Sequence, residues 1–121
     1  MTVLVEKSVT TLEDGIQNLL ESAKADYINR YGDDVNSDVA KIMIDRFNNG
    51  FVVKSGQKYI KIMCENGGSA WAFVVKDDTG KFKKGDILKC AGWNKPATNA
   101  SRGNVLDGMY EISWTGPLYL S

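Results

Sequence analysis

Asp78, Thr79 and Gly80 suggest chemistry most directly, because they spell the triplet found in aspartic proteases. That chemistry requires two carboxylates that share one proton in an apolar setting. Here the triplet lies between Asp77 and Lys81, and the composition of the stretch is typical of an exposed turn. We therefore interpret the triplet as a turn between two strands.

Other catalytic groups are scarce, because the chain contains no histidine. Histidine is the most frequent general base near neutral pH and the most frequent metal ligand. The two cysteines, Cys64 and Cys90, cannot complete a tetrahedral zinc site alone, and we interpret both as reduced residues packed within strands. The sequence therefore predicts a protein that is not an enzyme and that uses no metal or other cofactor.

Residues suited to binding are concentrated in CAGWNKPATNASRGNVLDG, residues 90–108, which has neither helical nor strand periodicity. Irregular segments longer than about 12 residues are uncommon in compact domains and are often functional. We predict an ordered loop in which a buried Trp93 is the anchor and Pro96 stiffens the chain. Asn104 is suited to replace missing backbone partners in a turn.

Arg102 is the only arginine after residue 50, and its guanidinium carries five donors. It could bind an external anion, or it could donate to carbonyls of its own loop and to a nearby acid such as Asp86 or Asp107. The second interpretation is favoured, since an irregular loop leaves many carbonyls without partners. The candidate residues for binding or for organising the loop are Trp93, Pro96, Arg102, Asn104 and Trp114.

The elements before this loop begin with two predicted helices. Thr10 and Glu13 have the spacing of a capping box, and apolar residues then recur every three or four positions. Gly32 is expected to end this helix, and a second helix is expected to begin at Asn36 or Ser37. One face of the second helix carries four apolar residues: Val39, Ile42, Met43 and Phe47. The short connection predicts a helical hairpin.

After the helices, the period changes to the alternation of β-strands. FVVKSGQKYIKIMC predicts two strands about a turn at Ser55–Gly56. AWAFVVK predicts a central strand whose Trp71, Phe73 and Val75 face the helical hairpin as core. The alternative, in which these aromatic residues stack on bases as in RNA-recognition folds, is disfavoured because no helix separates the strands.

Helices first and strands afterwards predict an α+β fold. We expect one domain, residues 1–121, mainly helical over 1–50 and mainly strand over 51–121. The helical hairpin should pack on an antiparallel β-meander or partly open barrel, with a long ordered loop at about residues 90–108.

Charge is distributed unevenly although the net charge is zero. Residues 1–50 carry five basic and nine acidic side chains, a net charge of −4, and residues 51–121 carry ten and six, a net charge of +4. This asymmetry is consistent with an anionic partner such as nucleic acid. The favoured explanations are attraction between the halves, or lysines that protect exposed strands from pairing.

A resemblance to a known family extends over roughly residues 58–120. The pattern GDILKCAGWNKPATNASRGNVLDG, with KYIKI before it and ISWTGPLYL after it, resembles small uncharacterised proteins encoded by tailed bacteriophages, with cyanophage members the nearest. The matching motifs are Gly85-Asp86-Ile87, Trp93 with Pro96-Ala97, Arg102-Gly103-Asn104 and Trp114-Thr115-Gly116. Cys90 and Thr98 depart from the pattern. The resemblance implies a phage source and supplies no activity.

From these observations we expect a small soluble protein that acts by binding in the cytoplasm of an infected host cell. The expected partner is a host or phage protein, or a second copy of the chain in a homo-oligomer. The alternative is nucleic acid, bound by the Lys-rich second half. No membrane association is expected, because no apolar run approaches the ~18 residues that a membrane span requires.

Overall fold

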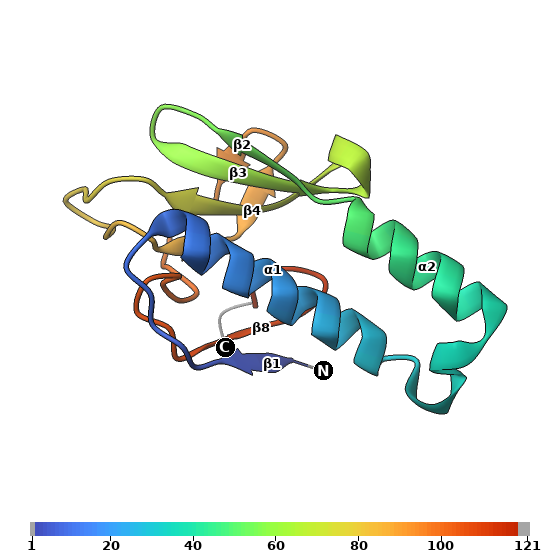
Figure 1. Ribbon diagram of the computed structural model, residues 1–121. Helices are drawn as coiled ribbons and strands as arrows, with labels where there is room; N and C mark the ends of the chain where they lie inside the picture. The colour runs from blue at the N-terminus through green and yellow to red at the C-terminus, as the bar shows by residue number, and fades with distance from the viewer. Residues whose placement is uncertain (1, 119–121) are drawn as a thin grey trace.

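The computed structural model describes residues 2–118 and places two helices beside antiparallel β-structure (Figure 1). In chain order the elements are β1 (Val3–Val5), α1 (Leu12–Asn29), the 3-10 helix η1 (Gly32–Asn36), α2 (Asp38–Asn49), β2 (Val52–Ser55), β3 (Tyr59–Cys64), the 3-10 turn η2 (Glu65–Gly67), β4 (Ser69–Val75), β5 (Ile87–Leu88), β6 (Cys90–Gly92), β7 (Lys95–Pro96) and β8 (Tyr110–Ile112). The predicted α+β class is confirmed, and the β-meander does not close into a barrel within the described residues.

Capping side chains set the start of both helices. Thr11 precedes α1 and accepts a hydrogen bond from the backbone N–H of Asp14 at 3.2 Å, so the cap lies one residue later than the predicted Thr10. Ser37 precedes α2 and accepts from the backbone N–H of Ala40 at 3.1 Å, so α2 begins where the sequence predicted.

No helix in the described part of the chain is long and apolar enough to cross a membrane.

The main sheet has the antiparallel strand order β2-β3-β4-β5, which is the predicted meander. Its register shifts once: Ile62 pairs with Ala72, whereas Met63 pairs with Ala70, so that Trp71 is the extra residue of a β-bulge. Trp71, Ala72 and Val74 consequently pack in the cluster that contains α1. Phe73 and Val75 pack in a second cluster, so the prediction that they face the helices with Trp71 is wrong.

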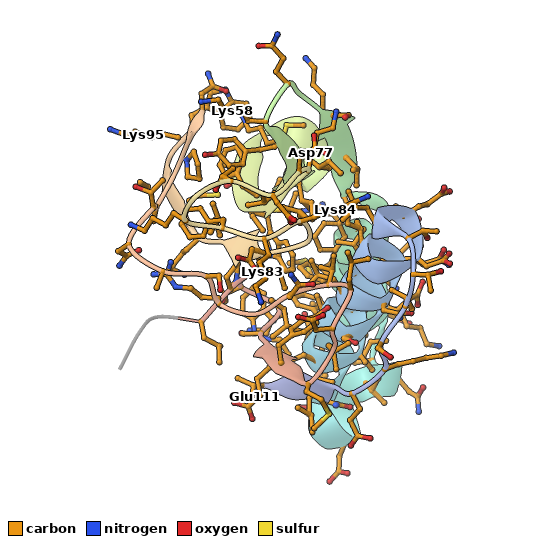
Figure 2. All side chains as sticks on the ribbon, turned by 90° about the vertical axis from the view of Figure 1, so that its left-hand side faces the viewer. Lys58, Asp77, Lys83, Lys84, Lys95 and Glu111 are labelled. Atoms are coloured by element: carbon orange, nitrogen blue, oxygen red, sulfur yellow. The ribbon has the colours of Figure 1, made fainter. Side chains whose placement is uncertain are left out.

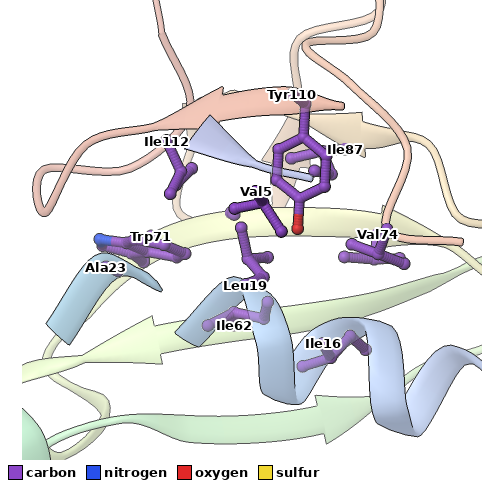
Figure 3. Close-up of a cluster of buried hydrophobic side chains, with 12 residues drawn as sticks. Val5, Ile16, Leu19, Ala23, Ile62, Trp71, Val74, Ile87, Tyr110 and Ile112 are labelled. Atoms are coloured by element: carbon purple, nitrogen blue, oxygen red, sulfur yellow. The ribbon is translucent and has the colours of Figure 1, made fainter. Parts of the chain in front are cut away.

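The larger core lies between α1 and the β-structure (Figure 3). Leu19 of α1 and Ile62 of β3 are fully buried there. Burial of one such side chain contributes about 1.5–3 kcal/mol. The smaller cluster gathers Phe73, Val75, Phe82 and Leu88. Because the larger cluster joins residues of α1 to residues of the sheet, α1 is the helix that covers the sheet.

The N-terminal strand was not predicted from the sequence. β1 pairs antiparallel with β8, in the register Val3 with Ile112 and Val5 with Tyr110. Helix α1 consequently lies between this two-stranded ribbon and the main sheet (Figure 1). A three-residue strand is too short to show a periodicity in the sequence.

The second helix of the hairpin packs much less than predicted. Only Ala40 of α2 is buried, while Val39 is 71% exposed and Ile42 is 60% exposed. Figure 1 shows α2 extending beyond the end of the sheet. The hairpin therefore packs on the sheet through α1, and α2 leaves apolar side chains at the surface.

Candidate functional site

Trp93 lies at the surface, so the prediction of a buried anchor is wrong. The residue is 49% exposed and occupies the turn with Asn94 between β6 and β7. Cys90 pairs with Pro96 across this small hairpin, and Pro96 is buried. Side chains at the tip of a two-residue hairpin project beyond the strands, which explains the exposure. Gly92 and Asn94, which flank Trp93, are the turn-forming residues that could have indicated it.

The buried anchor of the loop is Asn104. Its Nδ2 donates to the carbonyl of Lys84 at 2.9 Å and to Oδ1 of Asp86 at 3.0 Å. Its Oδ1 accepts from the backbone N–H groups of Leu106 at 2.8 Å and Asp107 at 3.1 Å. One amide side chain therefore replaces the backbone partners that an irregular loop lacks.

Arg102 donates within its own loop. Its Nη1 lies 2.9 Å from the carbonyl of Ala100 and 3.3 Å from Oδ1 of Asn99. Neither Asp86 nor Asp107 is among its hydrogen-bond partners in the described structure. Its Nε is buried and has no partner among the described residues. The guanidinium therefore satisfies loop oxygens without an ion pair to either acid.

A basic groove lies beside Trp93. We call it the Trp93 groove; it has a volume of about 330 Å³ and is lined by Lys54, Ser55, Gly56, Gln57, Lys58, Tyr59, Lys61, Met63, Phe73, Trp93 and Asn94. No acidic side chain is among these lining residues. The Nζ of Lys61 lies 3.5 Å from the centroid of the Trp93 ring and donates to Oδ1 of Asn94 at 2.9 Å. The groove thus combines exposed aromatic surface with concentrated positive charge.

A larger hollow lies beside Trp114 and shares no lining residue with the Trp93 groove. We call it the aromatic cleft; it has a volume of about 690 Å³ and is lined by Tyr27, Arg30, Met43, Arg46, Phe47, Cys64, Glu65, Asn66, Ser69, Ala70, Trp71, Trp114 and Thr115. Tyr27 stacks on Phe47 at 4.2 Å, and Trp114 meets Tyr27 edge-on at 5.2 Å. These rings join α1, α2 and the turn after β8.

Arg30 adds a cation to this ring cluster. Its guanidinium carbon lies 4.9 Å from the centroid of Trp114, 5.2 Å from that of Tyr27 and 5.1 Å from that of Tyr31. Cation–π contacts at this distance are worth about 0.5–1 kcal/mol at exposed sites. Its Nη1 donates to the hydroxyl of Tyr31 at 3.4 Å, and the guanidinium lies at the lining of the cleft.

Asp26 is hydrogen-bonded to the turn that contains Trp114. It is fully buried, and its Oδ2 accepts from the backbone N–H of Trp114 at 2.9 Å. Trp71 Nε1 donates to the carbonyl of Trp114 at 3.0 Å, so the peptide groups of Trp114 are held on both sides. Sequence reasoning missed Asp26. The signal was its spacing, three residues after Ala23 and seven after Leu19, which places a carboxylate on the apolar face of α1.

The two cysteines are free thiols. Burial raises the pKa of the Cys64 thiol, and the nearby charge of Glu65 raises it further. Burial also raises the pKa of the Cys90 thiol, although Lys61 and Lys89 oppose that change. No group of three His, Cys, Asp or Glu residues within the described chain is placed to hold a metal ion.

The fold and these two hollows define a small α+β domain in which the predicted candidates lie at separate places. Trp93 and Pro96 belong to the β6–β7 hairpin, Arg102 and Asn104 organise the loop behind it, and Trp114 lines the aromatic cleft.

The chain belongs to a family of unknown function (DUF7717), whose model matches residues 4–120. This match includes α1 and α2, which lie outside the phage-type resemblance. Neither the curated proteins nor the solved structures compared with the chain gave a match.

Proposed function

We propose that this chain is a protein-binding module without catalytic activity, and that it contacts its partner through the aromatic cleft and the adjoining surface of α2. The observation that carries the proposal is the continuity of the two surfaces. Val39 lies one helical turn before Met43, and Ile42 lies one turn before Arg46. Met43 and Arg46 line the cleft, whereas Val39 and Ile42 are exposed.

The residue types at this surface are those that dominate protein interfaces. Trp, Tyr and Arg carry most of the binding energy at interface hot spots, particularly in well-packed pockets. Trp114, Tyr27 and Arg30 lie in mutual contact at the cleft. A partner that inserts an apolar side chain there would also cover the exposed side of α2.

A second copy of the chain is the first partner to test. The helical half carries a net charge of −4 and the strand half +4, so the helical half of one copy attracts the strand half of another. A host or phage protein is the other partner of this class. The phage source and the host cytoplasm as its location belong to this proposal, and the sequence resemblance supports them.

Solution mass measured by light scattering across a range of concentrations tests self-association. The mass of the unmodified chain should rise toward that of an oligomer, and the double variant Val39→Gln, Ile42→Gln should remain monomeric. Met109→Asn is the matched control, because Met109 is 70% exposed and lies outside α2. Asparagine tolerates the backbone there, whose φ is +54°.

A monomeric mass at every concentration would exclude the second copy as partner. The remaining test is capture of host and phage proteins by the tagged chain and by the double variant. Failure to capture any protein whose retention depends on Val39 and Ile42 would overturn the proposal. Catalytic turnover in a hydrolase or nuclease screen, lost on replacement of one acid, would overturn its non-enzymatic part.

The alternative function, nucleic-acid binding by the Lys-rich second half, depends on different residues. Its support is the Trp93 groove, which lies on the sheet and shares no lining residue with the aromatic cleft.

A further inference from the structure

The surface at Trp93 combines an exposed indole ring with a cluster of lysines. We infer that the Trp93 groove binds a single strand of nucleic acid, with Trp93 stacking on a base and with Lys54, Lys58 and Lys61 facing phosphates. This inference is independent of the aromatic cleft, so either proposal can fail alone.

The charge of the groove matches a polyanion. Three lysines line it, and none of its described lining residues is acidic. A fourth lysine, Lys76, places its Nζ 2.9 Å from the carbonyl of Gly56 at the wall of the groove. Figure 2 shows Lys58 and Lys95 at the same end of the molecule, so positive charge continues onto the β6–β7 hairpin. A chain with zero net charge therefore carries a local group of lysines at this groove.

The ring of Trp93 is available for stacking. Lys61 covers part of one ring face, with its Nζ 3.5 Å from the ring centroid, and Trp93 as a residue remains 49% exposed. The hydrogen bond from Lys61 to Asn94 fixes the cation relative to the turn that carries the ring. A base that stacks on the exposed face therefore meets a ring that is already oriented. Stacking of this kind tolerates every base, because each base has a π-face.

A single strand fits this geometry better than a duplex. Bases in a duplex are stacked on each other, so a base must be free before an aromatic side chain can stack on it. The groove runs beside β2, which forms the edge of the main sheet, and all four residues of β2 are exposed. A nucleic-acid strand held at Trp93 can therefore continue past β2 without meeting another element of the sheet.

Fluorescence anisotropy with labelled oligonucleotides tests the inference. The probes are oligothymidylate and oligouridylate of about 12 nucleotides, a length within the range that ordinary single-strand binding folds cover. A DNA duplex of the same length is the comparison. We expect binding of at least one single strand, weaker binding of the duplex, and an affinity that falls about 20-fold between about 50 and 200 mM salt if three lysines contact phosphates. Because the two probes differ in the 2′-hydroxyl and in the thymine methyl group, a preference between them shows that the groove distinguishes at least one of these groups.

Matched variants separate this groove from general charge attraction. Trp93→Ala should weaken binding roughly 5- to 150-fold, and Trp93→Phe should recover part of the loss. Lys58→Ala should reduce the steepness of the salt dependence by about 0.7 in the log–log slope, whereas Lys7→Ala should leave it unchanged. Lys7 is an exposed lysine outside the groove.

Thermal melts of each variant accompany the titrations. Trp93 and Lys58 are exposed, so their replacement should leave the melting temperature nearly unchanged. The inference is overturned if neither single strand binds at low salt. It is also overturned if Trp93→Ala binds as well as the unmodified chain, or if Lys7→Ala weakens binding as much as Lys58→Ala.

Discussion

The backbone N–H of Trp114 donates a hydrogen bond to Oδ2 of Asp26 at 2.9 Å, and this bond joins the end of α1 to the turn after β8. Asp26 is fully buried, and its Oδ1 has no partner among the described residues. A buried carboxylate with an unpaired oxygen lowers the stability of the fold. Its presence here indicates that the position of Trp114, at the wall of the aromatic cleft, depends on Asp26.

Replacement of Asp26 tests that dependence. Asp26→Ala should lower the free energy of unfolding by about 1–3 kcal/mol, because the N–H of Trp114 loses its buried acceptor. Asp26→Asn keeps an acceptor of the same size and should cost less. Denaturant unfolding of both variants provides the measurement. Equal stability of Asp26→Ala and the unmodified chain would show that the hydrogen bond contributes nothing.

Gly15 provides a test of how closely α1 approaches the long loop. A Cβ at this position would lie 2.6 Å from the carbonyl oxygen of Val105, so α1 needs a residue without a side chain there. Gly15→Ala should therefore destabilise the fold by about 1–2 kcal/mol, although alanine is the better helix former by about 1 kcal/mol.

The control is Gly80→Ala, because a Cβ at Gly80 meets nothing within 4 Å. Its free energy of unfolding should change by less than about 0.5 kcal/mol. A stabilised Gly15→Ala variant in chemical denaturation would contradict the close approach of α1 to the loop.

Asn104 should contribute more to stability than any other of the predicted candidates in the loop. Asn104→Ala removes hydrogen bonds to Lys84, Asp86, Leu106 and Asp107 at once. Since each buried group left unpaired costs about 1–3 kcal/mol, we expect a loss of at least about 2 kcal/mol. Urea unfolding measures it, and a loss below about 1 kcal/mol would argue against Asn104 as the anchor.

Arg102→Lys should destabilise the fold by roughly 1 kcal/mol, less than Asn104→Ala. Lysine keeps the charge but lacks the planar guanidinium whose Nη1 donates both to the carbonyl of Ala100 and to Oδ1 of Asn99. The comparison is made from the unfolding midpoints of the two variants. Unchanged stability, together with weaker binding of an anionic partner, would instead assign Arg102 to an external anion.

The two thiols should react slowly with iodoacetamide at pH 8. Burial raises the pKa of both Cys64 and Cys90 above the ordinary value. Less thiolate is therefore present at that pH than in an unfolded chain, and the thiolate is the nucleophile. Mass spectrometry should show that the rate increases as the pH is raised and on addition of denaturant. Labelling of the folded chain as fast as that of the denatured chain would contradict this expectation.

Local signals in the sequence determined the elements that depend on near neighbours. Ser37 begins α2 because its hydroxyl can accept from a backbone N–H three residues later, a bond that needs no other part of the fold. The turn after β2 and the apolar run of β4 were likewise readable, because strand alternation and turn residues act over a few positions. These elements, in their order along the chain, already defined the α+β class.

Only the tertiary structure decided which side chains are covered and by what. The exposure of Trp93 depends on the pairing of Cys90 with Pro96, and the face on which Trp71 lies depends on a register shift between β3 and β4. The pairing of β1 with β8 and the bond from Trp114 to Asp26 join segments from opposite ends of the chain. The apolar periodicity of a sequence does not identify such partners. It indicates which face of a helix or strand a residue occupies and not what packs against that face.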